Sequence, residues 1–151
     1  SINYSVPWDT ATAIKEHQRS IDLIISSAAL EHVDDTAHTY YATNELLRDV
    51  GVIASSIDFK CHDTSGLRNG QWAYSDIEWR IIRGKSKYLI NRWPHSWHIE
   101  EMKKYFQIIH DDVYFHPNYL GRKDLAQKFS NIPDKELTIA EAFIIGKKFP
   151  K

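Results

Sequence analysis

Residues 52–66 read VIASSIDFKCHDTSG. The first ten of them are mostly β-branched or apolar, which predicts a β-strand over 52–61. The residues that follow are polar and end in glycine, which predicts a loop. Ile57 and Phe59 alternate with Asp58 and Lys60, so such a strand presents one charged face. The stretch therefore predicts a strand with one charged face, followed by a polar loop.

Helical patterns precede this strand. Residues 10–30 and 36–49 each carry apolar side chains at helical spacing, and Gly51 provides a stop for the second pattern. Asp34 and Asp35 offer caps for its start. We expect two helices before the strand.

Alternation predicts a hairpin after the strand. Residues 74–82 (YSDIEWRII) alternate apolar and charged, residues 83–86 (RGKS) form a turn, and residues 87–93 (KYLINRW) return. Residues 97–110 have a helical stripe, and 112–116 suit a short strand. Two more helices are expected, over 122–129 and over 138–148. The second of these would begin with a capping box of Thr138 and Glu141.

This order predicts an α+β fold, with a small antiparallel sheet of three to four strands flanked by helices. The chain has 151 residues, of which 42% are hydrophobic, so it can bury a core of its own. Neither a repeat nor a linker divides it. We expect residues 1–151 to form a single domain.

Composition narrows the function. A net charge of −1 argues against coating nucleic acid by bulk charge, although a local basic groove would suffice for a nuclease. A single cysteine, Cys61, excludes an intramolecular disulfide and multi-cysteine zinc sites, and indicates a reducing, cytoplasmic location. The sequence shows no signal peptide and no apolar run long enough to span a membrane, so no membrane partner is expected. It does not predict an oligomeric state.

Paired acidic and basic side chains suggest a metal-dependent phosphodiester site. Asp58 and Lys60 share one strand face, and Glu78 and Arg80 repeat that spacing on the next predicted strand. We expect Asp58 and Glu78 to hold Mg²⁺ or Mn²⁺. Lys60 or Arg80 would stabilise charge on the phosphoryl group, and His62 would carry a proton.

The triplets Asp58-Phe-Lys60 and Glu78-Trp-Arg80 loosely resemble the PD-(D/E)xK nuclease superfamily, which carries an acidic residue on one strand and a (D/E)-x-K triplet on a neighbour. The predicted order over residues 36–116 is similar to its core. Arg80 stands where that family has lysine, and no proline precedes Asp58. The resemblance implies a nuclease-like phosphodiester hydrolase acting on nucleic acid or a nucleotide.

Histidine motifs leave three other phosphoesterase or metal sites open. The His62-Asp63 doublet, with His38 and an aspartate at 111–112, is similar to the ligands of HD-type phosphohydrolases, which are all helical. Residues 62–64 (HDT) match one of the two H-x-T motifs of two-histidine phosphoesterases. His95 and His98, within the histidine-rich segment 95–116, have the spacing of a transition-metal site.

Basic and aromatic residues concentrate in the predicted hairpin region. Arg68, Trp72, Arg83 and Lys85 are expected to bind substrate, with cations for phosphates and rings for bases. The alternative function is a non-catalytic binding protein, whose hairpin surface grips a protein, a nucleic acid or a small ligand.

Overall fold

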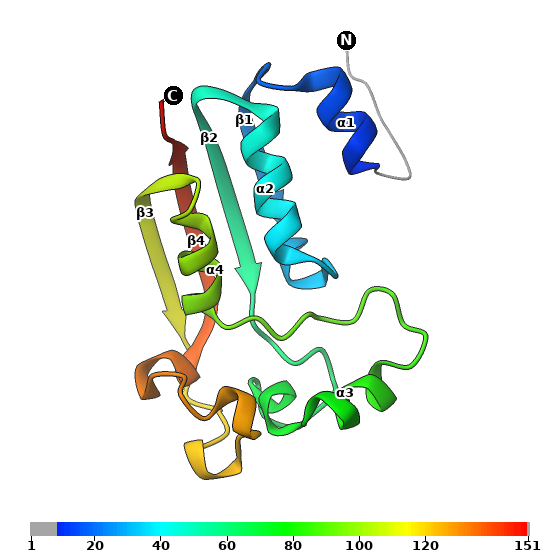
Figure 1. Ribbon diagram of the computed structural model, residues 1–151. Coiled ribbons are helices and arrows are strands. Elements are labelled where there is room, and N and C mark those ends of the chain that lie inside the picture. Colours follow the sequence, from blue (N-terminus) through cyan, green and yellow to red (C-terminus); the bar gives the residue numbers. More distant parts are fainter. Residues whose placement is uncertain (1–8, 151) are drawn as a thin grey trace.

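The computed structural model describes residues 9–150, which form four helices and four strands (Figure 1). The helices are α1 (Thr10–His17), α2 (Thr36–Leu46), α3 (Asp76–Arg83) and α4 (His95–Met102). The strands are β1 (Ile21–Ser27), β2 (Leu47–Asp58), β3 (Phe106–Phe115) and β4 (Ile139–Lys148). Short 3₁₀ turns punctuate the connections. No helix within this part of the chain is long and apolar enough to cross a bilayer.

The four strands make one mixed sheet in the order β1-β2-β4-β3. β1 and β2 are parallel, whereas β4 is antiparallel to both of its neighbours. The α+β class is therefore confirmed, but the expected purely antiparallel sheet is wrong. The parallel pair arises because α2 lies between β1 and β2 in the chain and carries it back, as parallel strands require.

The core lies on one face of this sheet, where α2 and α4 pack (Figure 1). Ile53 and Ile57 of β2 and Ile144 of β4 meet Tyr40 and Met102 of the helices there, all fully buried. Each such apolar side chain contributes about 1.5–3 kcal/mol on burial. On the opposite face Leu23 and Ile25 of β1 are 50% and 71% exposed.

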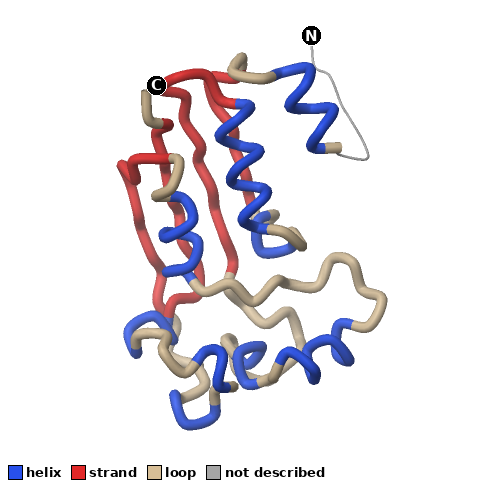
Figure 2. The backbone as a smooth tube through the Cα atoms, in the orientation of Figure 1, coloured by secondary structure: helices blue, strands red, loops and turns tan. Residues whose placement is uncertain are grey.

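Long loops gather at one end of the sheet, beyond the end of β2 (Figure 2). Two segments, 59–94 and 116–138, pack together there, and we call them the loop lobe. Buried Asn69 joins them, because its side-chain amide donates to the carbonyls of Leu120 and Leu137, both at 3.2 Å. Trp72 of the first segment and Phe129 of the second share a small apolar core.

The predicted helix over 10–30 ends at His17, and its second half is strand β1. Arg19 has a φ of 52°, which breaks the helix. Ile21, Ile24 and Ile25 then favour an extended chain, since β-branched side chains suit a pleated surface. The helical spacing over residues 10–30 therefore arose by chance, because the range contains a short helix and a strand.

The predicted hairpin over 74–93 is also wrong. Residues 76–83 form α3, and residues 87–93 form no regular element. The helix begins with a capping box, in which the Ser75 hydroxyl accepts from the Glu78 N–H while the Glu78 carboxylate accepts from the Ser75 N–H. The sequence signal S-x-x-E at 75–78 was present and outweighs the alternation.

The other elements divide between confirmed and wrong predictions. The strand over 52–61 is confirmed in part as β2, which ends at Asp58. The helix over 36–49 is confirmed in part as α2, which ends at Leu46, because residues 47–49 and Gly51 belong to β2. The strand over 112–116 is confirmed as the end of β3. The helix over 97–110 ends at Met102, and residues 122–129 form only 3₁₀ turns. The helix over 138–148 is β4, in which buried Ala142 and Ile144 alternate with exposed Glu141 and Phe143.

Candidate functional site

The candidate site lies where the two parallel strands end. In sheets with parallel strands, ligands bind outside the carboxyl ends of those strands. β1 ends at Ser27 and β2 at Asp58, and the loop lobe stands beyond this same end of the sheet (Figure 1). The residues that follow β1 and β2 therefore form the candidate site.

The segment directly after β1 is built from small residues. Residues 26–29 read SSAA, and Ser27, Ala28 and Ala29 are exposed. Ala28 has a φ of 47°, and its N–H donates to the Ser56 carbonyl at 3.0 Å, which closes the turn. Small side chains leave the backbone of this turn accessible to a ligand.

A half-buried asparagine from the loop lobe, Asn91, fixes the next turn, residues 30–36. The Asn91 side-chain amide nitrogen lies 2.7 and 3.1 Å from the carbonyl oxygens of Leu30 and Val33 and 2.9 Å from the Thr36 hydroxyl oxygen, and its two N–H groups donate to these three acceptors. Its backbone N–H donates to the Glu31 carbonyl at 2.7 Å. Four bonds from one residue hold this turn against the lobe.

Glu31 lies inside that turn with its carboxylate buried. Its exposed fraction is 3%, and neither carboxylate oxygen has a hydrogen-bond partner of good geometry. Burial raises the pKa of Glu31, and nearby backbone amides of Glu31 and Asp58 only partly oppose this rise. An unpaired carboxylate in such a place is costly for the fold, which is typical of functional sites.

Two histidines face each other beside Glu31. The rings of His32 and His62 meet edge to face, with their centroids 4.9 Å apart. Nδ1 of His32 lies 2.7 Å from the Tyr88 carbonyl oxygen, and Nδ1 of His62 lies 2.5 Å from that of Lys60. His32 follows β1 and His62 follows β2, so both parallel strands contribute to this pair.

An arginine closes the site toward β4. Arg68 Nη2 lies 3.6 Å from the Asp58 carboxylate and 3.9 Å from that of Glu141. Asp58 and Glu141 are partners in the β2–β4 register, which explains why one arginine reaches both. The Arg68 Nε is buried without a hydrogen-bond partner.

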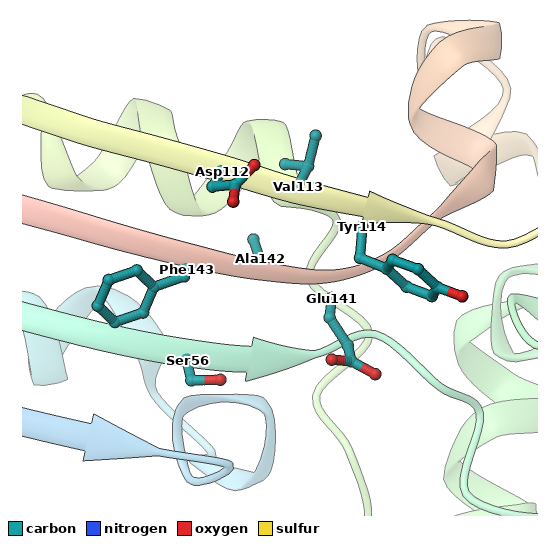
Figure 3. Close-up of a pocket in the computed structure, with 7 residues that line it drawn as sticks. All are labelled: Ser56, Asp112, Val113, Tyr114, Glu141, Ala142 and Phe143. Carbon is teal, nitrogen blue, oxygen red and sulfur yellow. The ribbon is translucent and has the colours of Figure 1, made fainter.

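Two hollows flank the site. An apolar one of about 500 Å³ runs beside β1 and α2, with Ile24, Ala29 and Leu30 in its wall. A shallower one of about 370 Å³ lies over the other face of the sheet, where Figure 3 shows Tyr114, Glu141 and Phe143 beside it. Ala29 belongs to both the first hollow and the turn after β1.

A second buried polar pair lies deeper in the core. The Tyr40 hydroxyl is 2.9 Å from Nδ1 of His98, and Nε2 of His98 has no partner. Complete burial lowers the pKa of His98 from 6.5 to about 3, with a smaller contribution from His95. Burial also raises the pKa of Tyr40. This pair is neutral, and its place between α2 and α4 makes it structural.

The structure separates the residues predicted to share a metal site. Asp58 pairs with Arg68, and its carboxylate also accepts from the Lys60 N–H at 2.8 Å. Glu78 belongs to the capping box of α3, and Arg80 is exposed on that helix. Within residues 9–150 no group of three or more His, Cys, Asp or Glu is placed to hold a metal ion.

Of the residues predicted to bind substrate, Arg83 and Lys85 line one hollow after α3, and Trp72 is not part of it. Trp72 is buried in the loop lobe, where its indole donates to the Arg92 carbonyl at 3.0 Å. Arg83 forms an ion pair with Asp34, and Lys85 is exposed in the turn after α3. Their roles in binding stay predictions. Sequence reasoning missed Glu31, His32 and Asn91; the only signal was a charged pair ending an apolar run at 21–30.

Comparisons with known proteins give the fold a context. No protein-family model and no curated protein matches the chain. Among solved structures, it is similar to a putative methyltransferase of Haloferax volcanii in complex with the Trm112 methyltransferase activator, at 14% identity and a TM-score of 0.53, over 97% of this chain and 58% of that one. It is also similar to an S-adenosylmethionine-dependent methyltransferase of Mesorhizobium loti, at 14% identity and a TM-score of 0.54, over 90% of this chain and 67% of that one.

A third structure, a putative S-adenosylmethionine-dependent methyltransferase of Listeria monocytogenes, has 14% identity and a TM-score of 0.50, over 87% of this chain and 63% of that one. At this identity the similarity establishes the fold alone. The chain spans between 58% and 67% of the lengths of these three proteins.

These findings correct the function predicted from the sequence. The three solved structures named above are methyltransferases, which overturns the phosphodiester hydrolase and nuclease prediction. The alternative of a non-catalytic binding protein stays a prediction. The Mg²⁺ or Mn²⁺ prediction is wrong as well, because the described residues form no metal cluster and these relatives are named for S-adenosylmethionine. The metal-site prediction failed because it depended on a hairpin that does not form. Glu78 and Arg80 lie on helix α3 and not on a strand beside β2.

Proposed function

We propose that this chain takes part in methyl transfer from S-adenosylmethionine, with its site at the carboxyl ends of β1 and β2. The main support is that the chain has a fold found in S-adenosylmethionine-dependent methyltransferases. Its parallel strand β1 ends in an open turn of small residues beside the loop lobe. Ligands bind at this end of such sheets.

The residues at this end fit such a cofactor. The turn at residues 26–29 offers accessible backbone groups and two serine hydroxyls, and the apolar hollow of about 500 Å³ begins at Ala29. Apolar walls with a few polar groups are what a small-molecule site requires. Residues 26–29 would hold the cofactor, which supplies an electrophilic methyl group on a sulfonium.

The loop lobe would bind the methyl acceptor. It stands over the same end of the sheet, and its own apolar core and the Asn69 bonds keep it rigid. Arg68 would orient an acidic group of the acceptor with the exposed part of its guanidinium. We propose a nucleic acid or a nucleotide as this acceptor. A cytoplasmic location stays a prediction.

Calorimetric titration of the full chain with S-adenosylhomocysteine tests the cofactor. We expect binding with a Kd below about 1 mM. Ala29→Trp should weaken it more than tenfold, because the indole fills the mouth of the hollow. Ala11→Trp, at an exposed position of α1, is the matched control and should leave binding unchanged. Wild-type chain that binds no S-adenosylhomocysteine would refute the proposal.

A further inference from the structure

Two half-buried histidines stand at the candidate site with one nitrogen each left over. His32 belongs to the 3₁₀ turn after β1, and His62 lies in the loop after β2. Their rings touch edge to face, with the centroids 4.9 Å apart. His98 is fully buried in the core, whereas His32 and His62 are only partly buried. Both lie at the end of the sheet where ligands bind.

The hydrogen bonds of these rings determine their tautomer. Each Nδ1 contacts a backbone carbonyl oxygen, that of Tyr88 for His32 and that of Lys60 for His62. A carbonyl oxygen can only accept, so each Nδ1 must carry the proton. In the neutral ring Nε2 then has a free lone pair. Neither Nε2 has a hydrogen-bond partner among the described residues.

The backbone around His62 is held in an uncommon conformation. His62 has a φ of 48° and Asp63 a φ of 65°, so two successive residues other than glycine are left-handed. Such positions are unfavourable for residues with a Cβ and persist where the surroundings impose them. This turn is what brings the imidazole of His62 against His32. The Thr64 N–H and hydroxyl, which both donate to the Cys61 carbonyl, fix the turn from its other side.

A metal ion is not what this pair fits. Within residues 9–150 no third His, Cys, Asp or Glu joins the two histidines in a metal-binding group. The two unpartnered Nε2 atoms can each accept a proton instead. The buried carboxylate of Glu31, in the same 3₁₀ turn, lies near His32.

We propose that His32 and His62 form the proton-accepting pair of the methyl-acceptor site, so the acceptor is a molecule whose nucleophilic atom carries a hydrogen. This inference rests on the proposed function. The acceptor's O–H, N–H or S–H bond breaks, and its proton passes to an Nε2 of the pair. The acceptor atom bonds to the methyl carbon as the carbon–sulfur bond of the sulfonium breaks, with its electron pair staying on sulfur. An acceptor without such a proton has no need of the pair.

The first test reads the tautomer without any activity. Long-range ¹H–¹⁵N correlation spectra of the full, ¹⁵N-labelled chain at neutral pH should show Nδ1–H and an unprotonated Nε2 for both rings. His32→Gln and His62→Gln assign the signals by removing one set each. An Nε2–H tautomer at either ring would overturn the inference.

The second test separates this inference from the proposed function. We expect transfer of a tritiated methyl group from S-adenosylmethionine to at least one of three probes, a catechol, a primary amine and a thiol, and none to dimethyl sulfide. His32→Gln or His62→Gln should lower the rate by about 10²- to 10⁴-fold, the range for a general base, while S-adenosylhomocysteine binding stays unchanged. His110→Gln, at an exposed position of β3, is the matched control and should keep the rate.

These measurements distinguish a failure of the proposed function from a failure of this inference. Absence of S-adenosylhomocysteine binding refutes the proposed function and this inference together. Normal binding with no transfer to the three probes, with transfer to dimethyl sulfide, or with full rates in both glutamine variants refutes the inference alone.

Discussion

Acid should destabilise this protein through one buried histidine. His98 is completely buried in the neutral form, with a pKa near 3 compared with 6.5 for the free side chain. Between these values the unfolded chain binds a proton at this position and the folded chain does not, so the free energy of unfolding falls as the pH falls below 6.5. Between pH 7 and pH 5 the loss is about 2 kcal/mol, since one pKa unit is worth about 1.4 kcal/mol.

Urea unfolding at several pH values between 5 and 7 measures this loss. His98→Asn removes the titrating group but keeps a polar side chain near the Tyr40 hydroxyl, so its stability should fall by about 2 kcal/mol less than that of wild type over this range. The comparison uses the slope with pH, so the lower starting stability of the variant does not affect it. Glu31, whose pKa is raised by burial, acts in the opposite direction and equally in both proteins. His38→Asn, at an exposed position of α2, should keep the wild-type slope. Equal slopes for wild type and His98→Asn would refute this reasoning.

Two further changes test how the site and the core are held. Asn91→Ala removes three side-chain hydrogen bonds to the turn at residues 30–36 and should cost about 2–4 kcal/mol in chemical denaturation, because the acceptors lose their partner. Exposed Asn131→Ala should cost under about 0.5 kcal/mol, and an equal loss in both would count against a clamping role for Asn91. Gly146→Ala should lower the unfolding free energy by about 1–3 kcal/mol, since its Cβ would meet three core side chains at 3.0–3.2 Å. Gly66→Ala, which meets nothing within 4 Å, should be neutral, and a thermal melt in which Gly146→Ala is equally neutral would contradict the packing described for the sheet.

Some elements could be predicted because local chemistry alone decides them. The strand over 52–61 contains three β-branched residues, Val52, Ile53 and Ile57. Helix α2 is capped by Asp35, whose side chain accepts from the His38 N–H. Signals of this kind act within a few residues. The α+β class was correct for the same reason, because enough of the elements carried such a signal.

Other elements needed partners far along the chain. Residues 138–148 have helix-compatible spacing, yet residues 139–148 lie as β4 between β2 and β3 and pair with both strands. The segment at residues 21–27 likewise becomes a strand by pairing with β2. Burial in a sheet outweighs local propensity, which is worth only tenths of a kcal/mol per residue.

The sequence by itself determined the α+β class, the strand that ends in Asp58 and the polar loop that carries His62. Only the tertiary structure decided which residues meet His62. It placed His32, 30 positions earlier in the chain, against that ring, because two parallel strands bring their carboxyl ends together whatever the spacing between them. It also moved Glu78 away from Asp58, because a capping box and the burial of Trp79 stabilise α3 where alternation had predicted a strand. The candidate site is therefore a product of strand pairing, which no local pattern encodes.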